Sequence, residues 1–180
     1  MIAVPFPLAI YGLSMWLPTI IKGFGVTDST TGLLSGVPYL FAVLGLCIVP
    51  RHSDKKRERY WHIVAVTSFG AVMLATSAWA GSAQLQFAFI CLAAFSLYAI
   101  QPVVWALPGE FLTGASAAVG IAAINSIGNL GGYFGPAGVG FIKDRTGSLT
   151  AGLYFLAATL LVAVIVTFAV RAALERPRAG

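Results

Sequence analysis

Long apolar runs are the feature of this sequence that most limits how the chain can fold. Only 9% of its 180 residues are charged, whereas 58% are hydrophobic and the mean hydropathy is +0.88. Soluble domains carry about 25% charged residues, which keep their surface in contact with water. A chain with so few charges cannot cover a surface that faces water on all sides. Its main solvent must therefore be lipid.

Six segments are long and apolar enough to be membrane-spanning helices, which need roughly 20 such residues. They cover residues 2–21, 33–49, 61–80, 85–107, 115–142 and 151–170. The fifth is longer than a span requires, so we expect it to tilt, bend or protrude. Asp28, Ser29 and Thr30 suit an N-cap for the second helix. The sequence thus predicts an all-α membrane protein with six transmembrane helices in a single domain, residues 1–180.

The basic residues predict how the chain is oriented, because Lys and Arg gather on the cytoplasmic side of a membrane. With six spans, both termini lie on the same side as the second and fourth connectors. That side holds eight Lys and Arg residues, including Arg171, Arg176 and Arg178, whereas the other side holds three. We expect a multi-pass protein of the plasma (inner) membrane with both termini in the cytoplasm. Basic residues confined to short connectors do not form the broad face that a nucleic-acid partner requires.

Several other function classes find no support in the sequence. Cys47 and Cys91 lie inside apolar runs and are expected to be small buried side chains rather than a disulfide. No metal-ligand spacing and no phosphate-binding loop occurs, so we expect no metal and no cofactor. Residues 114–116 read Gly-Ala-Ser, like the motif of rhomboid proteases, but the last span has no histidine to complete a dyad. The Asn-Pro-Ala loops of aquaporin-like channels are missing as well, and we expect no enzyme.

Asp, Glu, Lys and Arg are missing from the interior of all six predicted spans. A proton-coupled carrier needs a carboxylate or histidine within the membrane, and an anion carrier usually needs a buried cation. If the chain belongs to such a carrier, those groups lie on another segment of polypeptide.

Uncharged polar side chains mark one face of four predicted spans. They recur at helical spacing as Tyr11 with Ser14, Ser35 with Tyr39, Tyr98 with Gln101 and Trp105, and Asn125 with Asn129. Four helices with a polar face and two without suggest four that line a pathway and two that face lipid. The alternative for each residue is a hydrogen bond between helices, which involves no ligand.

The fifth span is rich in glycine. Gly128 and Gly132, and likewise Gly131 and Gly135, have the GxxxG spacing that lets two membrane helices approach closely. Such packing suits helices that rock during transport, and it suits static packing equally.

The basic connector at residues 51–59 could act only as an anchor that fixes topology. Asp54 among its basic residues suggests a second role, since a carboxylate can pair with a basic residue or with a helix N-terminus. We therefore expect Asp54 and Arg51 to latch one conformation. His52 and His62 lie near the membrane interface, where we expect structural roles. Asp54 and Asp144 are 90 residues apart in similar short motifs, a weak sign of an inverted repeat.

Several stretches resemble the C-terminal half of the major facilitator superfamily and, more narrowly, its anion:cation symporter family of bacterial organic-anion carriers. They are Tyr11–Gly25, Arg51–Arg59, Trp105–Pro108, and Ile124–Gly132 followed by Gly135–Pro136. The resemblance implies one half-bundle of that fold, built as a 3+3 inverted repeat. It also implies a central site in which Trp105 packs on the solute's carbon skeleton and Asn125 hydrogen-bonds its hydroxyl or carboxylate. Gln101 and Tyr11 are weaker candidates. The family's connector motif normally begins with glycine, whereas Pro50 precedes Arg51 here.

The family's carriers are built from two six-helix halves, of which this chain would supply one. The charges that bind the anion and couple it to protons would then belong to the missing N-terminal half. We predict the C-terminal half of a proton-coupled symporter whose partners are a small carboxylate solute, a proton and the lipid bilayer. One alternative is a truncated or accessory membrane protein without transport activity, because no basic stretch precedes the first span. Another is a homodimer of half-transporters, against which the missing intramembrane charges argue.

Overall fold

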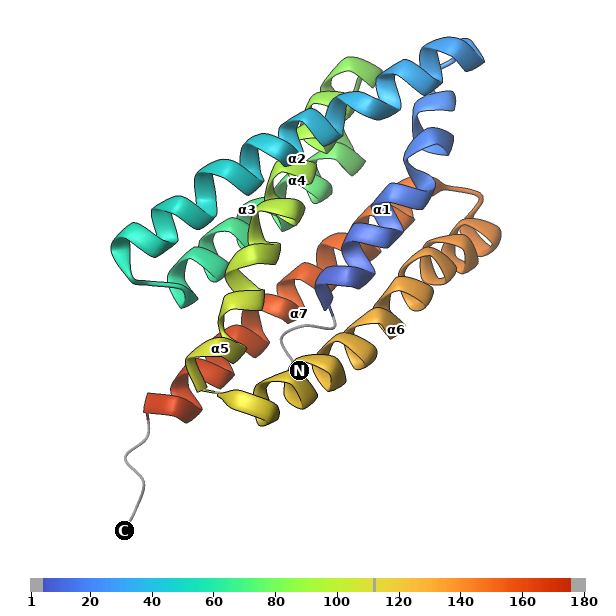
Figure 1. Cartoon of the computed structure of the whole chain (residues 1–180). Helices are drawn as coiled ribbons and strands as arrows, with labels where there is room; N and C mark the ends of the chain where they lie inside the picture. Colours follow the sequence, from blue (N-terminus) through green and yellow to red (C-terminus); the bar gives the residue numbers. More distant parts are fainter. Residues whose placement is uncertain (1–4, 112, 176–180) are drawn as a thin grey trace.

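The computed structural model describes residues 5–111 and 113–175, and every regular element in these two ranges is an α-helix. In chain order they are α1 (Pro5–Lys22), α2 (Asp28–Lys56), α3 (Tyr60–Trp79), α4 (Ala83–Ala106), α5 (Pro108–Phe111), α6 (Gly114–Thr146) and α7 (Leu149–Glu175). The long helices correspond one to one to the predicted apolar runs and lie side by side in one bundle (Figure 1). The predicted all-α class is confirmed. Residue 2, where the first predicted span begins, and Arg176 and Arg178 lie outside the described residues.

Helix α2 is longer than the span predicted at residues 33–49. Its N-cap is Thr27, one residue before the expected group, and the Thr27 hydroxyl accepts a hydrogen bond from the backbone N–H of Thr30 at 3.3 Å. The helix continues to Lys56 and ends at Arg57, whose φ of 51° is left-handed. Much of the predicted connector is thus helical. Hydropathy identifies the residues that suit lipid. The helix is longer than this stretch because its backbone hydrogen bonds continue into the polar residues that follow.

Two further boundaries differ from the prediction. The connector expected after the fourth span contains the short helix α5, which begins at Pro108, a residue whose fixed φ suits a first helical position. The helix α6 extends beyond the predicted residues 115–142 to Thr146 and ends at Gly147, whose φ of 69° closes the helix.

Within the described residues, α2, α3, α4 and α7 are long and apolar enough to cross a membrane. The other two long helices, α1 and α6, do not reach that hydropathy. They carry Tyr11, Ser14, Asn125 and Asn129 among their residues, and such polar residues lower the mean hydropathy of a helix. The count of six spans therefore stays a prediction.

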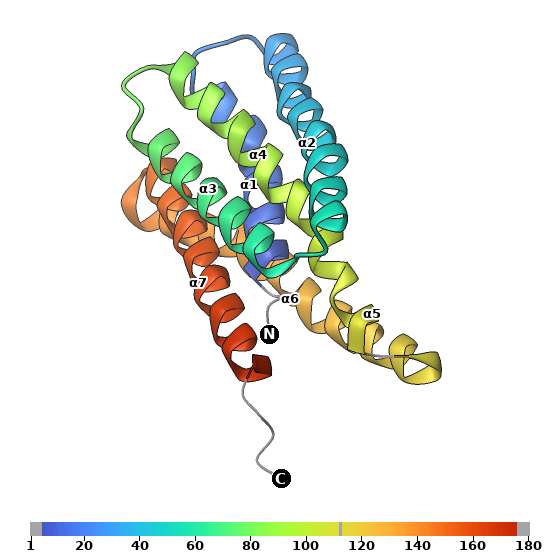
Figure 2. The same ribbon diagram turned by 90° about the vertical axis from the view of Figure 1, so that its left-hand side faces the viewer.

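Helix α4 lies at the centre of the bundle, and α2 lies on its outside. In the most apolar stretch of α4, 56% of the residues are buried inside the bundle, whereas in that of α2 only 17% are. Helix α4 packs against α2 and α3, α3 also packs against α7 (Figure 2), and α1 pairs with α6. The core includes Leu97 and Ile100 of α4. Leu40 and Val43 of α2 stay exposed, as expected of a helix that faces lipid.

Helices α1 and α6 pack closely where residues 8–16 of α1 meet residues 132–143 of α6. The Leu8 carbonyl lies against Gly135, and the Tyr11 ring lies against Gly132. Further along, the Trp16 indole N–H donates to the Pro136 carbonyl at 3.0 Å, and the Lys143 ammonium lies 4.8 Å from the Trp16 ring centre. These contacts form a continuous seam, which we call the α1–α6 seam. Gly128 and Gly131 are buried as well.

Candidate functional site

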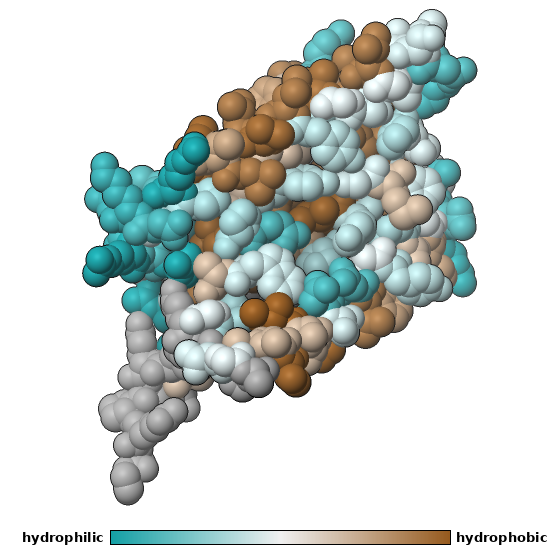
Figure 3. Space-filling model, viewed as in Figure 1, coloured by the Kyte–Doolittle hydropathy of each residue, from teal (hydrophilic) through white to brown (hydrophobic). Residues whose placement is uncertain are grey.

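One face of the bundle is hollowed along its middle. Figure 3 shows pale and teal residues in this strip, between apolar residues along α2 on one side and along α6 on the other. The residues predicted to form the polar faces of α1, α2, α4 and α6 are all at least partly accessible: Tyr11, Tyr39, Asn125 and Asn129 are exposed, and Ser14, Ser35, Tyr98, Gln101 and Trp105 are half-buried. Polar side chains that remain accessible within an apolar bundle are candidates for a solute path.

Tyr98 of α4 brings three helices together. Its hydroxyl lies 3.2 Å from the Ser14 hydroxyl of α1, within hydrogen-bonding distance. The Tyr39 ring of α2 packs edge-on against the Tyr98 ring, with 5.9 Å between the ring centres and 73° between the planes. Helical spacing identified the polar face of each helix, and the structure joins these faces.

Trp105 and Gln101 form a pair on α4. The Trp105 indole N–H donates to the Gln101 side-chain carbonyl at 3.1 Å. This bond fixes the indole plane, and it does not use the N–H groups of the Gln101 amide, which can donate to another partner. The pair can therefore present a flat apolar ring beside a polar amide.

Asn125 and Asn129 form a second pair, on α6. The Asn129 amide donates to the Asn125 side-chain carbonyl at 3.2 Å. Both side chains are exposed, so their remaining donor and acceptor groups can reach a solute. Within the described ranges, no hydrogen bond or ring contact joins Asn125 to Trp105.

The structure pairs Asp54 with a residue other than the predicted Arg51. The Asp54 carboxylate lies 3.1 Å from the Arg59 guanidinium, whereas Arg51 donates to the Cys47 carbonyl of its own helix at 3.4 Å. The chain reverses after Arg57 and brings Arg59 back to the last turn of α2. The ion pair that Asp54 forms at this connector is thus with Arg59.

His52 and His62, for which structural roles are predicted, lie in contact with each other in the structure. His52 Nδ1 lies 2.7 Å from His62 Nε2, and His62 Nδ1 lies 2.9 Å from the Glu58 carboxylate. Partial burial acts to raise the pKa of Glu58, but hydrogen bonds from the backbone N–H groups of Trp61 and His62 and from the His62 ring hold that pKa below its ordinary value. The reversal of the polypeptide at Arg57 brings these three side chains together, and sequence patterns do not reveal it. No group of three or more side chains in the described residues could hold a metal ion.

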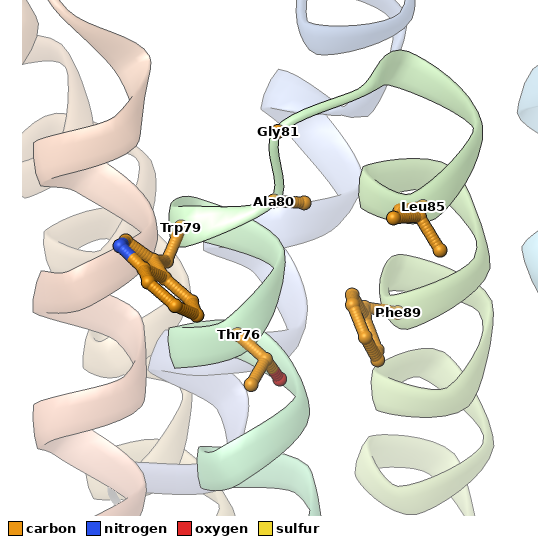
Figure 4. A pocket seen from close by; sticks show the side chains of 6 residues that line it. All are labelled: Thr76, Trp79, Ala80, Gly81, Leu85 and Phe89. Carbon is orange, nitrogen blue, oxygen red and sulfur yellow. The ribbon is translucent and has the colours of Figure 1, made fainter.

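A separate cavity of about 430 Å³ lies where α3 meets α4. Figure 4 shows that α3, α4 and their connector line it, through Thr76, Trp79, Ala80, Gly81, Leu85 and Phe89. These side chains include no charge and none of the predicted site residues. The cavity is an apolar depression apart from the polar face described above.

Known families and proteins match most of the chain. Residues 1–136 match the family described as the Major Facilitator Superfamily. A quinolone resistance transporter of Acinetobacter baumannii is 50% identical over 175 residues, which make up 97% of this chain and 40% of that protein. A protein named for tartrate transport in Agrobacterium vitis is 45% identical over 158 residues, 88% of this chain and 36% of that protein. The inner membrane transport protein RhmT of Escherichia coli (strain K12) is 32% identical over 168 residues, 91% of this chain and 38% of that protein. The chain thus spans about two fifths of the length of these relatives.

Proposed function

Because the chain belongs to the Major Facilitator Superfamily, a family of membrane transporters rather than of enzymes, we propose that it is the C-terminal six-helix half of a longer carrier. The carrier moves small organic anions with a carboxylate group across the plasma (inner) membrane, with both of its termini in the cytoplasm. The proposal includes six membrane spans related as a 3+3 inverted repeat. The fraction of each relative that the chain matches, 36–40%, supports a missing N-terminal half.

The observation that carries this proposal is the polar face on an otherwise apolar bundle. Four helices contribute uncharged hydrogen-bonding groups to it, including the Trp105–Gln101 pair and the Asn125–Asn129 pair. A bundle that only filled a membrane would have no reason to keep such groups accessible. The name of the Agrobacterium vitis relative, given for tartrate, supports a carboxylate as the solute.

Each pair has a distinct chemical role in this proposal. Trp105, with its indole plane fixed by Gln101, packs against the carbon skeleton of the solute. Asn125 donates from its amide to a carboxylate or hydroxyl oxygen, and Tyr11 borders the same face from α1. None of these side chains carries a charge, so the carboxylate must meet its cation on the missing half. The group that binds the co-transported proton belongs there too.

Alternating access requires the two halves to rock about the solute. The α1–α6 seam supports a rigid-body movement of this half, because its close backbone contacts resist sliding. Gly131 and Gly128 extend the same small-residue surface towards the start of α6.

A second candidate function is drug export, since the Acinetobacter baumannii relative is named for quinolone resistance. Exposed aromatic side chains such as Tyr39 could pack on a ring system. The direction of proton-driven transport separates the two functions, because a symporter accumulates its solute on the side to which protons flow and an exporter does the reverse.

The test is uptake of labelled tartrate into liposomes that contain the whole carrier, with an inward proton gradient. Asn125→Ala and Trp105→Ala should each raise KM about tenfold, the equivalent of 1.4 kcal/mol. Trp79→Ala is the matched control, because Trp79 is 82% exposed and lines the separate apolar cavity. Tartrate uptake that ignores the proton gradient, or equal kinetics of all three variants, would refute the proposal. Full transport by residues 1–180 alone would also refute the proposal and would favour a homodimer of halves. A native polypeptide of this length that transports nothing would favour an accessory protein.

A further inference from the structure

Tyr98, Ser14 and Tyr39 come from three different helices and meet on the polar face. The Tyr98 hydroxyl lies within hydrogen-bonding distance of the Ser14 hydroxyl, and the Tyr98 ring packs against the Tyr39 ring. We call them the hydroxyl cluster. Tyr98 is central, since it contacts both of the others. None of the three belongs to the pairs on α4 and α6 to which the proposed function assigns solute contacts.

The hydroxyl cluster differs from the other hydroxyl groups of the bundle in how it forms hydrogen bonds. Most of those donate to a carbonyl of their own helix, as Ser35, Thr159 and Thr167 do at 2.7 Å. That bond satisfies the hydroxyl within one helix. Ser14 and Tyr98 instead bond side chain to side chain across two helices.

A count of donors shows that this bond leaves hydrogen-bonding capacity unused. Each hydroxyl has one O–H donor and two acceptor lone pairs. Of the three O–H groups in the cluster, the bond between Ser14 and Tyr98 uses one, in whichever direction it runs, and a bond between Tyr39 and Tyr98 would use a second. One donor and several lone pairs therefore remain, beside a Tyr39 side chain that is 39% exposed. An uncharged group that both donates and accepts, such as an alcohol, satisfies this arrangement.

We propose that Tyr98, with Ser14 and Tyr39, forms a subsite that binds alcoholic hydroxyl groups of the transported anion and so sets its specificity. This inference rests on the proposed function, because it assumes that an organic anion enters the polar face. The subsite is distinct from Asn125 and Trp105, which take the carboxylate end and the carbon skeleton. A solute without hydroxyl groups leaves the cluster unsatisfied and is bound less tightly.

The experiment compares tartrate with succinate, which has the same dicarboxylate chain and lacks the two hydroxyl groups. Both acids, unlabelled, compete with labelled tartrate for uptake by the whole carrier in liposomes. The unaltered carrier should prefer tartrate. Tyr98→Phe removes one oxygen and keeps the ring that Tyr39 packs against, so it should weaken competition by tartrate about tenfold. Competition by succinate should stay within about twofold.

Two further variants keep this result interpretable. Ser14→Ala removes the other member of the bonded pair. Like Tyr98→Phe, it should reduce the preference of the carrier for tartrate over succinate. Tyr154→Phe is the matched control, since Tyr154 is 45% exposed and lies on α7, a helix that contributes no member of the cluster. A general loss of folding would weaken both acids alike, whereas loss of the subsite weakens tartrate alone.

The outcomes separate this inference from the proposed function. If the unaltered carrier transports tartrate but Tyr98→Phe weakens both acids equally, or neither, the subsite is refuted and the proposed function stands. If the unaltered carrier neither transports tartrate nor is inhibited by succinate, the proposed function fails and the subsite fails with it.

Discussion

The backbone carbonyl of Leu8 occupies the space that a Cβ atom on Gly135 would need. Backbone atoms cannot rotate away as a side chain can, so α1 and α6 would have to separate to admit even an alanine. Glycine at position 135 thus lets α1 and α6 pack closely, although these two helices are less apolar than the other long helices.

Gly135→Ala should therefore destabilise the protein by about 1–3 kcal/mol, the usual range for overpacking. The measurement is thermal unfolding of the purified carrier in detergent. Gly36→Ala is the control, because beyond its chain neighbours and its own helix backbone no atom lies within 4 Å of the position of its added Cβ. Equal melting temperatures for the two variants would contradict the close contact.

Thr67 gives a prediction in the opposite direction. Its hydroxyl oxygen is buried and has no hydrogen-bond partner in the part of the chain that the structure describes. Thr67→Val replaces an unsatisfied polar group with a methyl group of the same shape, so stability should stay unchanged or rise by about 1 kcal/mol. Ser96→Ala should instead lower stability by about 1 kcal/mol, because the buried Ser96 hydroxyl donates to the Val66 carbonyl. Chemical unfolding of both variants would check this, and a clear loss in Thr67→Val would show that its hydroxyl has a partner.

Glu58 should make stability depend on pH. Its carboxylate accepts hydrogen bonds from the backbone N–H groups of Trp61 and His62 at the start of α3 and from the His62 ring. Because these bonds hold the pKa of Glu58 below its ordinary value in the folded protein, its stabilising contribution is present above the unfolded pKa. The contribution is lost as the pH falls through the folded pKa.

Glu58→Gln should thus lower stability at neutral pH, by about 0.3–1 kcal/mol for a charge at a helix N-terminus. It should also flatten the loss of stability at acidic pH. Melting temperatures measured across the acidic range would show this, with Asp144→Asn as a control for the loss of an exposed carboxylate at the end of α6. The opposite sign, a variant more stable at neutral pH, would contradict the assigned hydrogen bonds.

The sequence predicted which residues share a face of one helix, but it could not predict which helices meet. Spacing placed Tyr39 on the polar face of α2 and Tyr98 on that of α4, because side chains three or four residues apart lie on one side of a helix. Their contact depends on α2 packing against α4, and nothing in a single apolar run specifies that pairing. The contact of His52 with His62 was unpredicted for a related reason. It depends on the left-handed turn at Arg57, a conformation that residues other than glycine seldom adopt.

The ion pair between Asp54 and Arg59 gives the last prediction, which concerns rate rather than stability. The Asp54 side chain is 62% exposed, and an exposed pair contributes only about 0–1 kcal/mol to folding. Asp54→Asn should therefore melt within a few degrees of the unaltered carrier. A latch at this connector must be broken and remade in each transport cycle, so removing it should change the maximal uptake rate several-fold while KM stays nearly constant. High salt, which screens exposed charges, should change the rate of the unaltered carrier in the same direction and have little effect on the variant. Asp28→Asn, which removes the exposed pair with Lys22 at the other end of the bundle, is the matched control. If both variants transport at the unaltered rate, Asp54 only anchors the connector, and the latch must be sought elsewhere.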